Sequence, residues 1–239
     1  MIIEYILLAL VVFLASIVPE LTGFGVATVS MAFLPLFLPL ELVIPLVAIV
    51  SVTATGIVAL TTKSKEIIKY ILPLVLGSVV GVILGMIFLE LINEDILKTI
   101  LGAFLMVYSL YGLLNKNTFF PSNKMIGGVV GLVAGFFASL FNIHGPLVGI
   151  YSSANKNLSK VQIKDLIATY MFFAGLFTVI GHSLSGRMTY DVLWRALFVL
   201  PFLLLGLVVG RKLFNKIDVR LIKKTVYIII FFAGISFIF

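Results

Sequence analysis

Two short polar stretches interrupt the apolar sequence of this chain, and they carry residue types suited to binding an anion. The first is PELTGFG at 19–25, and the second is NIHGP at 142–146. Proline and glycine both stop helices, so each stretch predicts a helix that ends and restarts. A restarting helix presents free backbone N–H groups at its positive end, where a negative charge can bind without a lysine.

The residues around these breaks are the candidates for substrate binding. Glycines let a ligand approach the backbone closely, and hydroxyl, amide and imidazole groups can donate hydrogen bonds. Ser16 and Ser139 occupy similar places, one turn before each break. The predicted substrate-binding residues are Thr22, Gly23, Phe24, Gly25, Ser139, Asn142, His144, Gly145 and Pro146.

Two ionisable residues at the breaks are candidates for carrying a coupling proton. His144 titrates near neutral pH and suits an anion contact or a proton carrier; alternatively, it is a neutral ring that satisfies the broken backbone. Glu20 is costly inside a membrane unless it is protonated, paired or wet, so it either carries the proton or faces the outer aqueous side. The other histidine, His182, is expected at the membrane interface near an outer helix end.

The elements that position these residues are expected to be membrane helices. Of the 239 residues, 62% are hydrophobic and 11% are charged, whereas soluble domains carry about a quarter charged residues. The sequence contains no cysteine and no P-loop or zinc motif, so we expect no cofactor, no metal and no catalytic residue. The net charge is +7, and the basic residues lie in short loops between apolar runs. This distribution favours loops on the cytoplasmic side of a membrane, by the positive-inside rule, over a nucleic-acid-binding surface.

Six apolar runs are long enough to cross a bilayer, and two further regions, 3–38 and 125–154, read as helix, break, helix. Basic loops mark the cytoplasmic side on both flanks of 125–154, so that region enters and leaves there as a hairpin, whereas the acid-rich NEDILK at 93–98 marks the outside. The six predicted spans are roughly 42–62, 69–92, 96–114, 162–184, 191–212 and 220–239.

Each half is thus a broken helical hairpin followed by three transmembrane helices. Three crossings are an odd number, so the second half is inverted relative to the first, as in many secondary transporters. We predict an all-α polytopic membrane protein with one transmembrane domain, made of repeat one (1–118) and repeat two (119–239), with the N-terminus and C-terminus outside. If both broken elements cross the membrane instead, the halves are parallel.

Small residues recur at intervals of four in GSVVGVILG (77–85) and at Gly127, Gly131 and Gly135. This spacing allows close helix packing, and a homodimer formed through it is a hypothesis.

The N-terminal stretch has no basic leader and carries Glu4, so we expect a retained helix rather than a signal peptide. Ser51, Thr53, Thr55, Thr169 and Tyr170 lie inside spans and are candidates for lining a path.

The same two regions resemble a known family. TGFGVATVSMAFLPLFLPLELVIPLVAIVS (22–51) is similar to the first half of the TauE/SafE sulfite exporters, and GLVAGFFASLFNIHGPLVGIYSSANKNLSKVQIKDL (131–166) is similar to the second half. The resemblance implies an integral membrane carrier for small anions, notably sulfite, sulfonates and related sulfur compounds, in the plasma membrane of a prokaryote. The chain departs from the family pattern at the breaks, where it has only Gly23 and Gly25 and carries NIH.

Three functions follow from these features. The leading hypothesis is a secondary transporter that lies in the lipid bilayer and moves a small anion across it by alternating access. The alternative is a passive anion channel lined by the same helix ends. A membrane enzyme that uses His144 is a third, although no other part of a catalytic set is apparent.

Overall fold

The computed structural model describes residues 2–22, 25–60, 67–114, 123–155, 158–213 and 218–238, without the side chains of residues 19–22, 58, 160, 219 and 220. This part of the chain is helical and contains no strand. The elements are α1 (Ile2–Thr22), α2 (Val26–Phe33), the 3-10 helix η1 (Leu34–Leu36), α3 (Leu40–Ala59), α4 (Ile68–Leu91), α5 (Glu94–Leu114), α6 (Lys124–Phe141), α7 (Gly145–Ser153), α8 (Lys160–Leu184), α9 (Tyr190–Leu213) and α10 (Val219–Ser236).

The prediction of an all-α polytopic membrane protein is confirmed. Within the described ranges, six helices are long and apolar enough to cross a membrane, namely α3, α4, α5, α6, α8 and α9. Both predicted breaks separate helices, since α1 ends before α2 and α6 ends before α7. The predicted span 220–239 forms α10, which is not among the six and carries Lys223 and Lys224 in its first two turns.

The helices form two compact units, and each is considered by itself. The first unit combines residues 1–50, 92–116 and 189–239, and therefore holds α1, α2, η1, α5, α9, α10 and the first half of α3. The second unit combines residues 51–91 and 117–188, and therefore holds the rest of α3 with α4, α6, α7 and α8. Each unit thus draws on both halves of the sequence.

In the first unit, α1 packs along α9, and α5 packs along α10. Residues further along α1 contact residues further along α9. The rings of Tyr5 and Phe198 lie 5.1 Å apart, and the Phe13 carbonyl approaches Gly206. The two helices are therefore parallel. A side chain at Gly206 would collide with α1, so the glycine sets this close approach.

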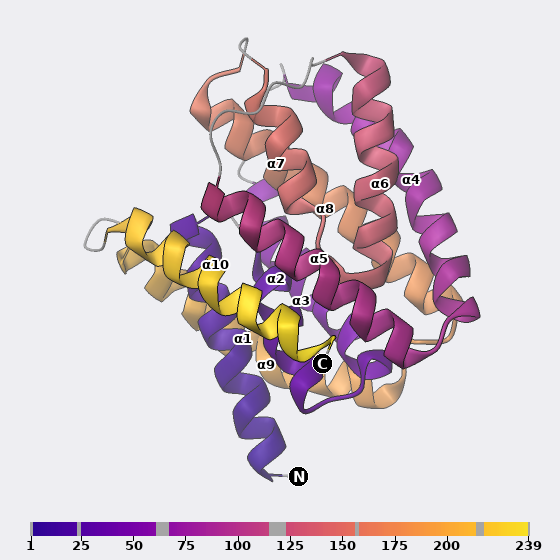
Figure 1. The fold of residues 1–239 in the computed structure, drawn as a ribbon, viewed down its shortest axis with the longest axis vertical. Coiled ribbons are helices and arrows are strands. Elements are labelled where there is room, and N and C mark those ends of the chain that lie inside the picture. Colours follow the sequence, from indigo (N-terminus) through magenta and orange to yellow (C-terminus); the bar gives the residue numbers. More distant parts are fainter. Residues whose placement is uncertain are drawn as a thin grey trace. The chain divides into compact units, whose positions relative to one another are not determined.

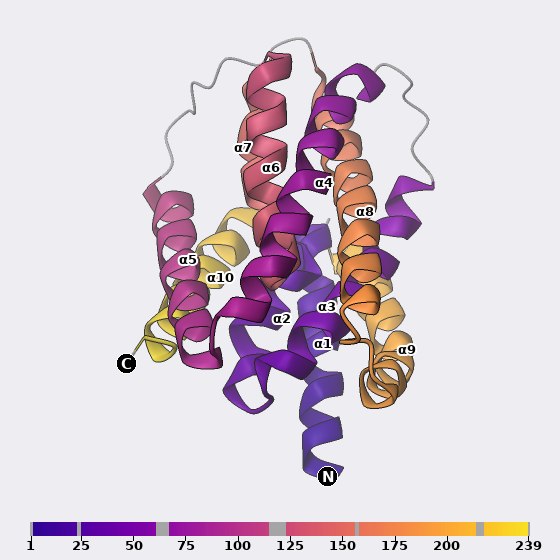
Figure 2. The ribbon, with the colours of Figure 1, turned by 90° about the vertical axis from the view of Figure 1, so that its right-hand side faces the viewer.

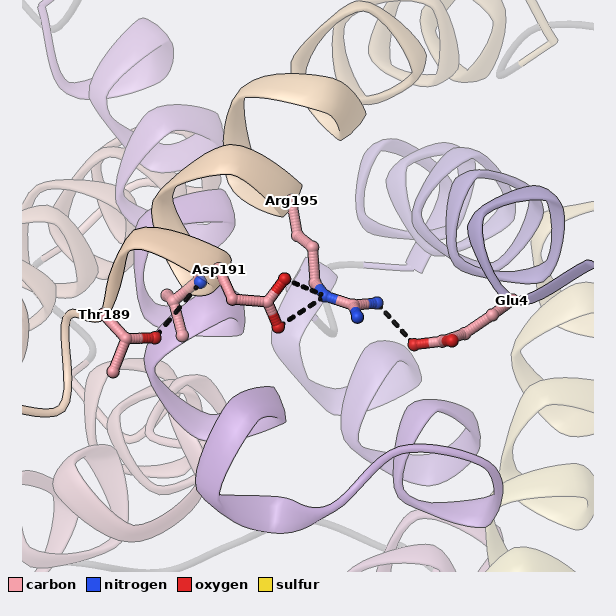
Figure 3. A network of polar contacts seen from close by, with 5 residues as sticks. Glu4, Thr189, Asp191 and Arg195 are labelled. Carbon is pink, nitrogen blue, oxygen red and sulfur yellow. Dashed lines mark hydrogen bonds and ion pairs between the residues drawn. The ribbon is translucent and has the colours of Figure 1, made fainter. Parts of the chain in front are cut away.

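A charged cluster joins α1 to α9 in this unit (Figure 3). The guanidinium of Arg195 lies between two carboxylates, with its Nη1 atom 2.5 Å from Glu4 Oε1 and its Nε atom 3.0 Å from Asp191 Oδ2. The Arg195 side chain is only 12% exposed, and it also lies 4.9 Å from the Tyr5 ring. Pairing with two carboxylates offsets the cost of partly burying this cation.

In the second unit, α4 and α6 pack in parallel through glycines (Figures 1 and 2). A Cβ added to Gly81 would collide with the Leu132 carbonyl, and one added to Gly135 would collide with the backbone of Ser78. The predicted close packing is therefore confirmed, but it occurs within one chain. These glycines contact the neighbouring helix of the same chain, and a homodimer stays a hypothesis.

The second broken element is a hairpin, because α7 returns along α6. Tyr151 in α7 donates a hydrogen bond of 3.1 Å to the carbonyl of Asn123, the residue that caps the start of α6. Val148 and Tyr151 are buried in a cluster with Leu166, Tyr170 and other residues of α4, α6 and α8. The polypeptide therefore enters and leaves this element at the same end of α6.

Candidate functional site

The break in the second unit begins where Asn142 ends α6. Asn142 has φ 56° and ψ 17°, the left-handed conformation that asparagine tolerates better than most residues. Its N–H donates a 2.8 Å hydrogen bond to the Ala138 carbonyl, which closes the last turn. The side chain is buried, so this helix end lies inside the protein rather than at its surface.

The start of α7 offers two backbone donors. The helix begins Gly145, Pro146, Leu147, and the bond from the Val148 N–H to the His144 carbonyl is long, at 3.3 Å. Proline has no N–H, so the free donors of this first turn are those of Gly145 and Leu147, which have no acceptor inside the helix. With nine residues, α7 also places the positive end of its dipole here.

His144 is the residue that directly precedes α7 in the sequence, and it is 1% exposed. Neither ring nitrogen makes a hydrogen bond, and the side chain does not cap α7. The ring meets the Tyr170 ring edge-on at 5.8 Å, and the Met171 backbone gives it only a polar contact without hydrogen-bond geometry. The imidazole therefore does not satisfy the broken backbone of α7, and its nitrogens keep their capacity for another partner.

Tyr170 adds a second polar group beside His144. Its side chain is fully buried, and its hydroxyl has no hydrogen bond of ordinary geometry, although the Ser78 side chain is a polar neighbour. Ser78 itself donates to the Val75 carbonyl at 2.8 Å. Ser78 and Tyr170 both lie near the middle of their long helices, so the break reaches the middle of the unit. The sequence predicts Tyr170 as a candidate for lining the path of the substrate.

The end of α6 carries a different set of groups. Ser139 is buried, and its hydroxyl donates to the Phe136 carbonyl at 2.8 Å. His182 in α8 is completely buried, without a hydrogen bond on either nitrogen, and the backbone of Ser139 is its polar neighbour. His182 lies in the last turn of α8, near a helix end as the sequence suggests, but its side chain is buried in the protein, where α8 packs on α4 and α6.

The first break is described only in part. Gly25, the residue before α2, has φ 78° and ψ 149°, a conformation that glycine adopts readily and other residues avoid. Ser16 in α1 is buried and donates to the Val12 carbonyl, much as Ser139 bonds its own helix. Gly23 and Phe24 lie outside the described residues, as do the side chains of Glu20 and Thr22.

Buried polar groups in the described part of the chain are all formally neutral side chains. They include serines, threonines, asparagines and the two histidines, with no lysine, arginine, aspartate or glutamate among them. The same residues contain no group of three or more histidine, aspartate or glutamate side chains that could hold a metal ion. An anion bound at the second break would therefore meet helix ends and neutral donors.

Comparison with known proteins identifies the family. The model of the family described as Sulfite exporter TauE/SafE matches residues 8–237, nearly the whole chain. No curated protein and no solved structure matches the chain. The match spans both broken elements and the helices around them. This multi-pass membrane protein therefore belongs to the TauE/SafE sulfite exporter family, whose members are membrane transporters of sulfur anions.

Proposed function

We propose that this protein is a secondary transporter that moves sulfite, an organosulfonate or a related sulfur oxyanion by alternating access, and that the anion binds at the start of α7. One observation carries the proposal: His144 is buried with no hydrogen bond of ordinary geometry on either ring nitrogen, and it directly precedes the N–H groups of Gly145 and Leu147, which have no acceptor inside α7. Broken helices of secondary transporters direct such N-termini at anionic substrate groups.

The other predicted residues have defined places in this proposal. Gly145 and Pro146 form the first turn of α7, Asn142 ends α6, and Ser139 lies in the last turn of α6. At the first break, Gly25 precedes α2, and we assign Thr22, Gly23, Phe24 and Gly25 to a second anion-binding helix end. The positive φ of Gly25 supports this assignment, because a glycine there lets the ligand approach the backbone.

The helix contacts support two repeats, 1–118 and 119–239. If α1–α5 correspond in order to α6–α10, then α4 is equivalent to α9, and α6 is equivalent to α1. The main partner of α4 is α6, the main partner of α9 is α1, and both pairs are parallel. Each repeat therefore contributes its fourth helix to the first helix of the other. The loop charges favour the inverted arrangement, with both termini outside a prokaryotic plasma membrane.

Glu20 and His144 remain the proposed carriers of a coupling proton. A homodimer also remains a proposal, but it would need a face other than the glycine stripe of α4 and α6. Flux measured in proteoliposomes with and without an imposed pH gradient addresses coupling. We expect Glu20→Gln or His144→Gln to reduce the stimulation by the gradient, and unchanged stimulation in both variants would contradict these assignments.

The anion site is tested by thermal unfolding of the detergent-purified protein with methanesulfonate or sulfite. We expect a rise in the unfolding midpoint that is reduced in His144→Gln. His182→Gln is the matched control, because His182 is equally buried in the same unit and lies beside the end of α6 instead of the start of α7. Equal loss of the anion effect in both variants would contradict a site at α7.

The passive anion channel is distinguished from the transporter by its kinetics. A transporter in proteoliposomes gives saturable uptake and exchange of labelled anion for internal unlabelled anion. A channel gives a current that follows the electrochemical gradient without exchange. Absence of saturable flux for sulfite, thiosulfate and methanesulfonate would contradict transport of sulfur anions by this mechanism.

A further inference from the structure

We propose that the site at the start of α7 selects singly charged oxyanions, namely sulfonates and hydrogen sulfite, over doubly charged sulfate, thiosulfate and sulfite. The inference rests on the proposed function, since it concerns the same site. It goes beyond that function because it fixes the charge of the transported species rather than its chemical family.

The hydrogen-bond donors at the site are neutral. They are the N–H groups of Gly145 and Leu147, the single ring N–H of neutral His144 and the hydroxyl of Tyr170. His144 and Tyr170 are essentially fully buried, and these three side-chain atoms make no hydrogen bond of ordinary geometry in the described structure. The donors available to an oxyanion bound beside His144 are therefore uncharged.

The basic side chains of this unit lie away from the break. In the described parts of α4, α6, α7 and α8, the basic residues Lys69, Lys124 and Lys164 are exposed near helix ends. Arg187 follows α8 and donates a 3.1 Å hydrogen bond to the Leu89 carbonyl at the end of α4. No lysine or arginine of the described chain is buried in either unit. When His144 is neutral, a bound anion therefore has no buried counter-ion among these residues.

The free-energy cost of burying an anion rises more steeply with its charge than the attraction to helix dipoles does. The cost of transferring an ion from water to a low-dielectric site grows with the square of its charge, so a dianion costs about four times as much as a monoanion of similar size. The attraction to fixed dipoles grows only in proportion to charge, so it about doubles. Without a buried cation, the second charge adds more cost than gain, and the monoanion is favoured.

The test uses anions of fixed and variable charge with the full-length protein in detergent. Methanesulfonate is a monoanion at all pH values used, sulfate and thiosulfate are dianions, and sulfite changes from monoanion to dianion near neutral pH. Apparent dissociation constants come from the rise of the unfolding midpoint with anion concentration. We expect sulfate and thiosulfate to bind at least roughly tenfold more weakly than methanesulfonate, and total sulfite to bind more weakly as the pH rises.

Methanesulfonate also provides the control for titration of the protein. If the substrate's own charge sets the pH dependence, methanesulfonate affinity changes little over the range in which sulfite affinity falls, and His144→Gln keeps the difference between the two ligands. Binding of sulfate or thiosulfate as tight as that of methanesulfonate would overturn the proposal while leaving an anion site at α7. Absence of stabilisation by every anion would instead overturn the proposed function itself.

Discussion

At the residue scale, the polar side chains near the second break differ in how their hydrogen-bonding capacity is used. Ser139 donates to its own helix, whereas His144 and Tyr170 are buried without hydrogen bonds of ordinary geometry. An unsatisfied buried polar group usually costs about 1–3 kcal/mol. Such a cost is reasonable at a binding site, because a ligand that supplies the missing partners recovers it.

Asn142 allows the backbone and side-chain roles at the break to be separated. We expect Asn142→Ala to be less stable than Asn142→Gly by about 1 kcal/mol, because both remove the carboxamide but only alanine resists the left-handed conformation. Thermal unfolding without ligand measures this difference. If the carboxamide contacts the anion, both variants lose the same share of the methanesulfonate effect. Equal stability of the two variants would show that the conformation is not maintained.

The Arg195 cluster gives a second prediction at this scale. Glu4→Gln removes the ion pair between α1 and α9 and is expected to cost about 1 kcal/mol, since both side chains are partly shielded. Asp191→Asn removes only a pair within α9 whose carboxylate is half-exposed, and is expected to cost less than about 0.5 kcal/mol. Unfolding midpoints of the two variants give the comparison. A larger effect for Asp191→Asn would contradict a role for Glu4 in holding the two helices together.

At the element scale, the glycines of α4 and α6 fix the first arm of the broken hairpin to a long helix, whereas α7 contacts its neighbours through larger side chains. A Cβ added to Gly131 or Gly135 would collide with the α4 backbone, whereas one added to Gly149 in α7 would lie 3.8 Å from the end of the Ile167 side chain. Side-chain contacts adjust more readily than backbone contacts. We therefore expect α7 to be the arm that moves during transport.

A matched pair of substitutions tests the glycine contact. Gly81→Ala places a methyl group against the Leu132 carbonyl, and we expect a loss of about 2–3 kcal/mol or failure to fold. A Cβ at Gly128, in the same helix pair, meets nothing within 4 Å. Gly128→Ala is therefore expected to be neutral or to stabilise by up to about 1 kcal/mol through helix propensity. Equal loss of folded protein in both variants, measured by size-exclusion yield and unfolding midpoint, would contradict the packing.

At the scale of the whole molecule, the orientation of the loops can be measured directly because the chain has no cysteine. Single cysteines then report their side of the membrane without background. We expect Met188→Cys, between α8 and α9, to react with an impermeant maleimide in intact cells. Ser122→Cys, in a basic loop, should react only after permeabilisation. The reverse pattern would invert the proposed topology, and labelling of both in intact cells would contradict it.

The sequence was sufficient to predict the helices, because long apolar runs and the Pro and Gly breaks are local signals. The element 125–154 was predicted as a hairpin from the basic loops on both sides, and the Tyr151 bond to Asn123 agrees. Contacts between distant segments were not predictable in the same way. The burial of the His182 side chain and the use of the glycine stripe within the chain could not be predicted, because neither motif specifies which helix packs against it.

The parallel pairing of α1 with α9 and of α4 with α6 also has a consequence for biosynthesis. In each pair, other helices separate the two partners along the sequence. The glycine face of α4 must therefore stay uncovered in the bilayer until α6 has been inserted. α1 lacks its partner helix for longer, because Glu4 meets Arg195 only when α9 emerges from the ribosome near the end of translation. Assembly of this protein is therefore completed late, and a nascent chain that stops before α9 leaves an unpaired carboxylate in its first helix.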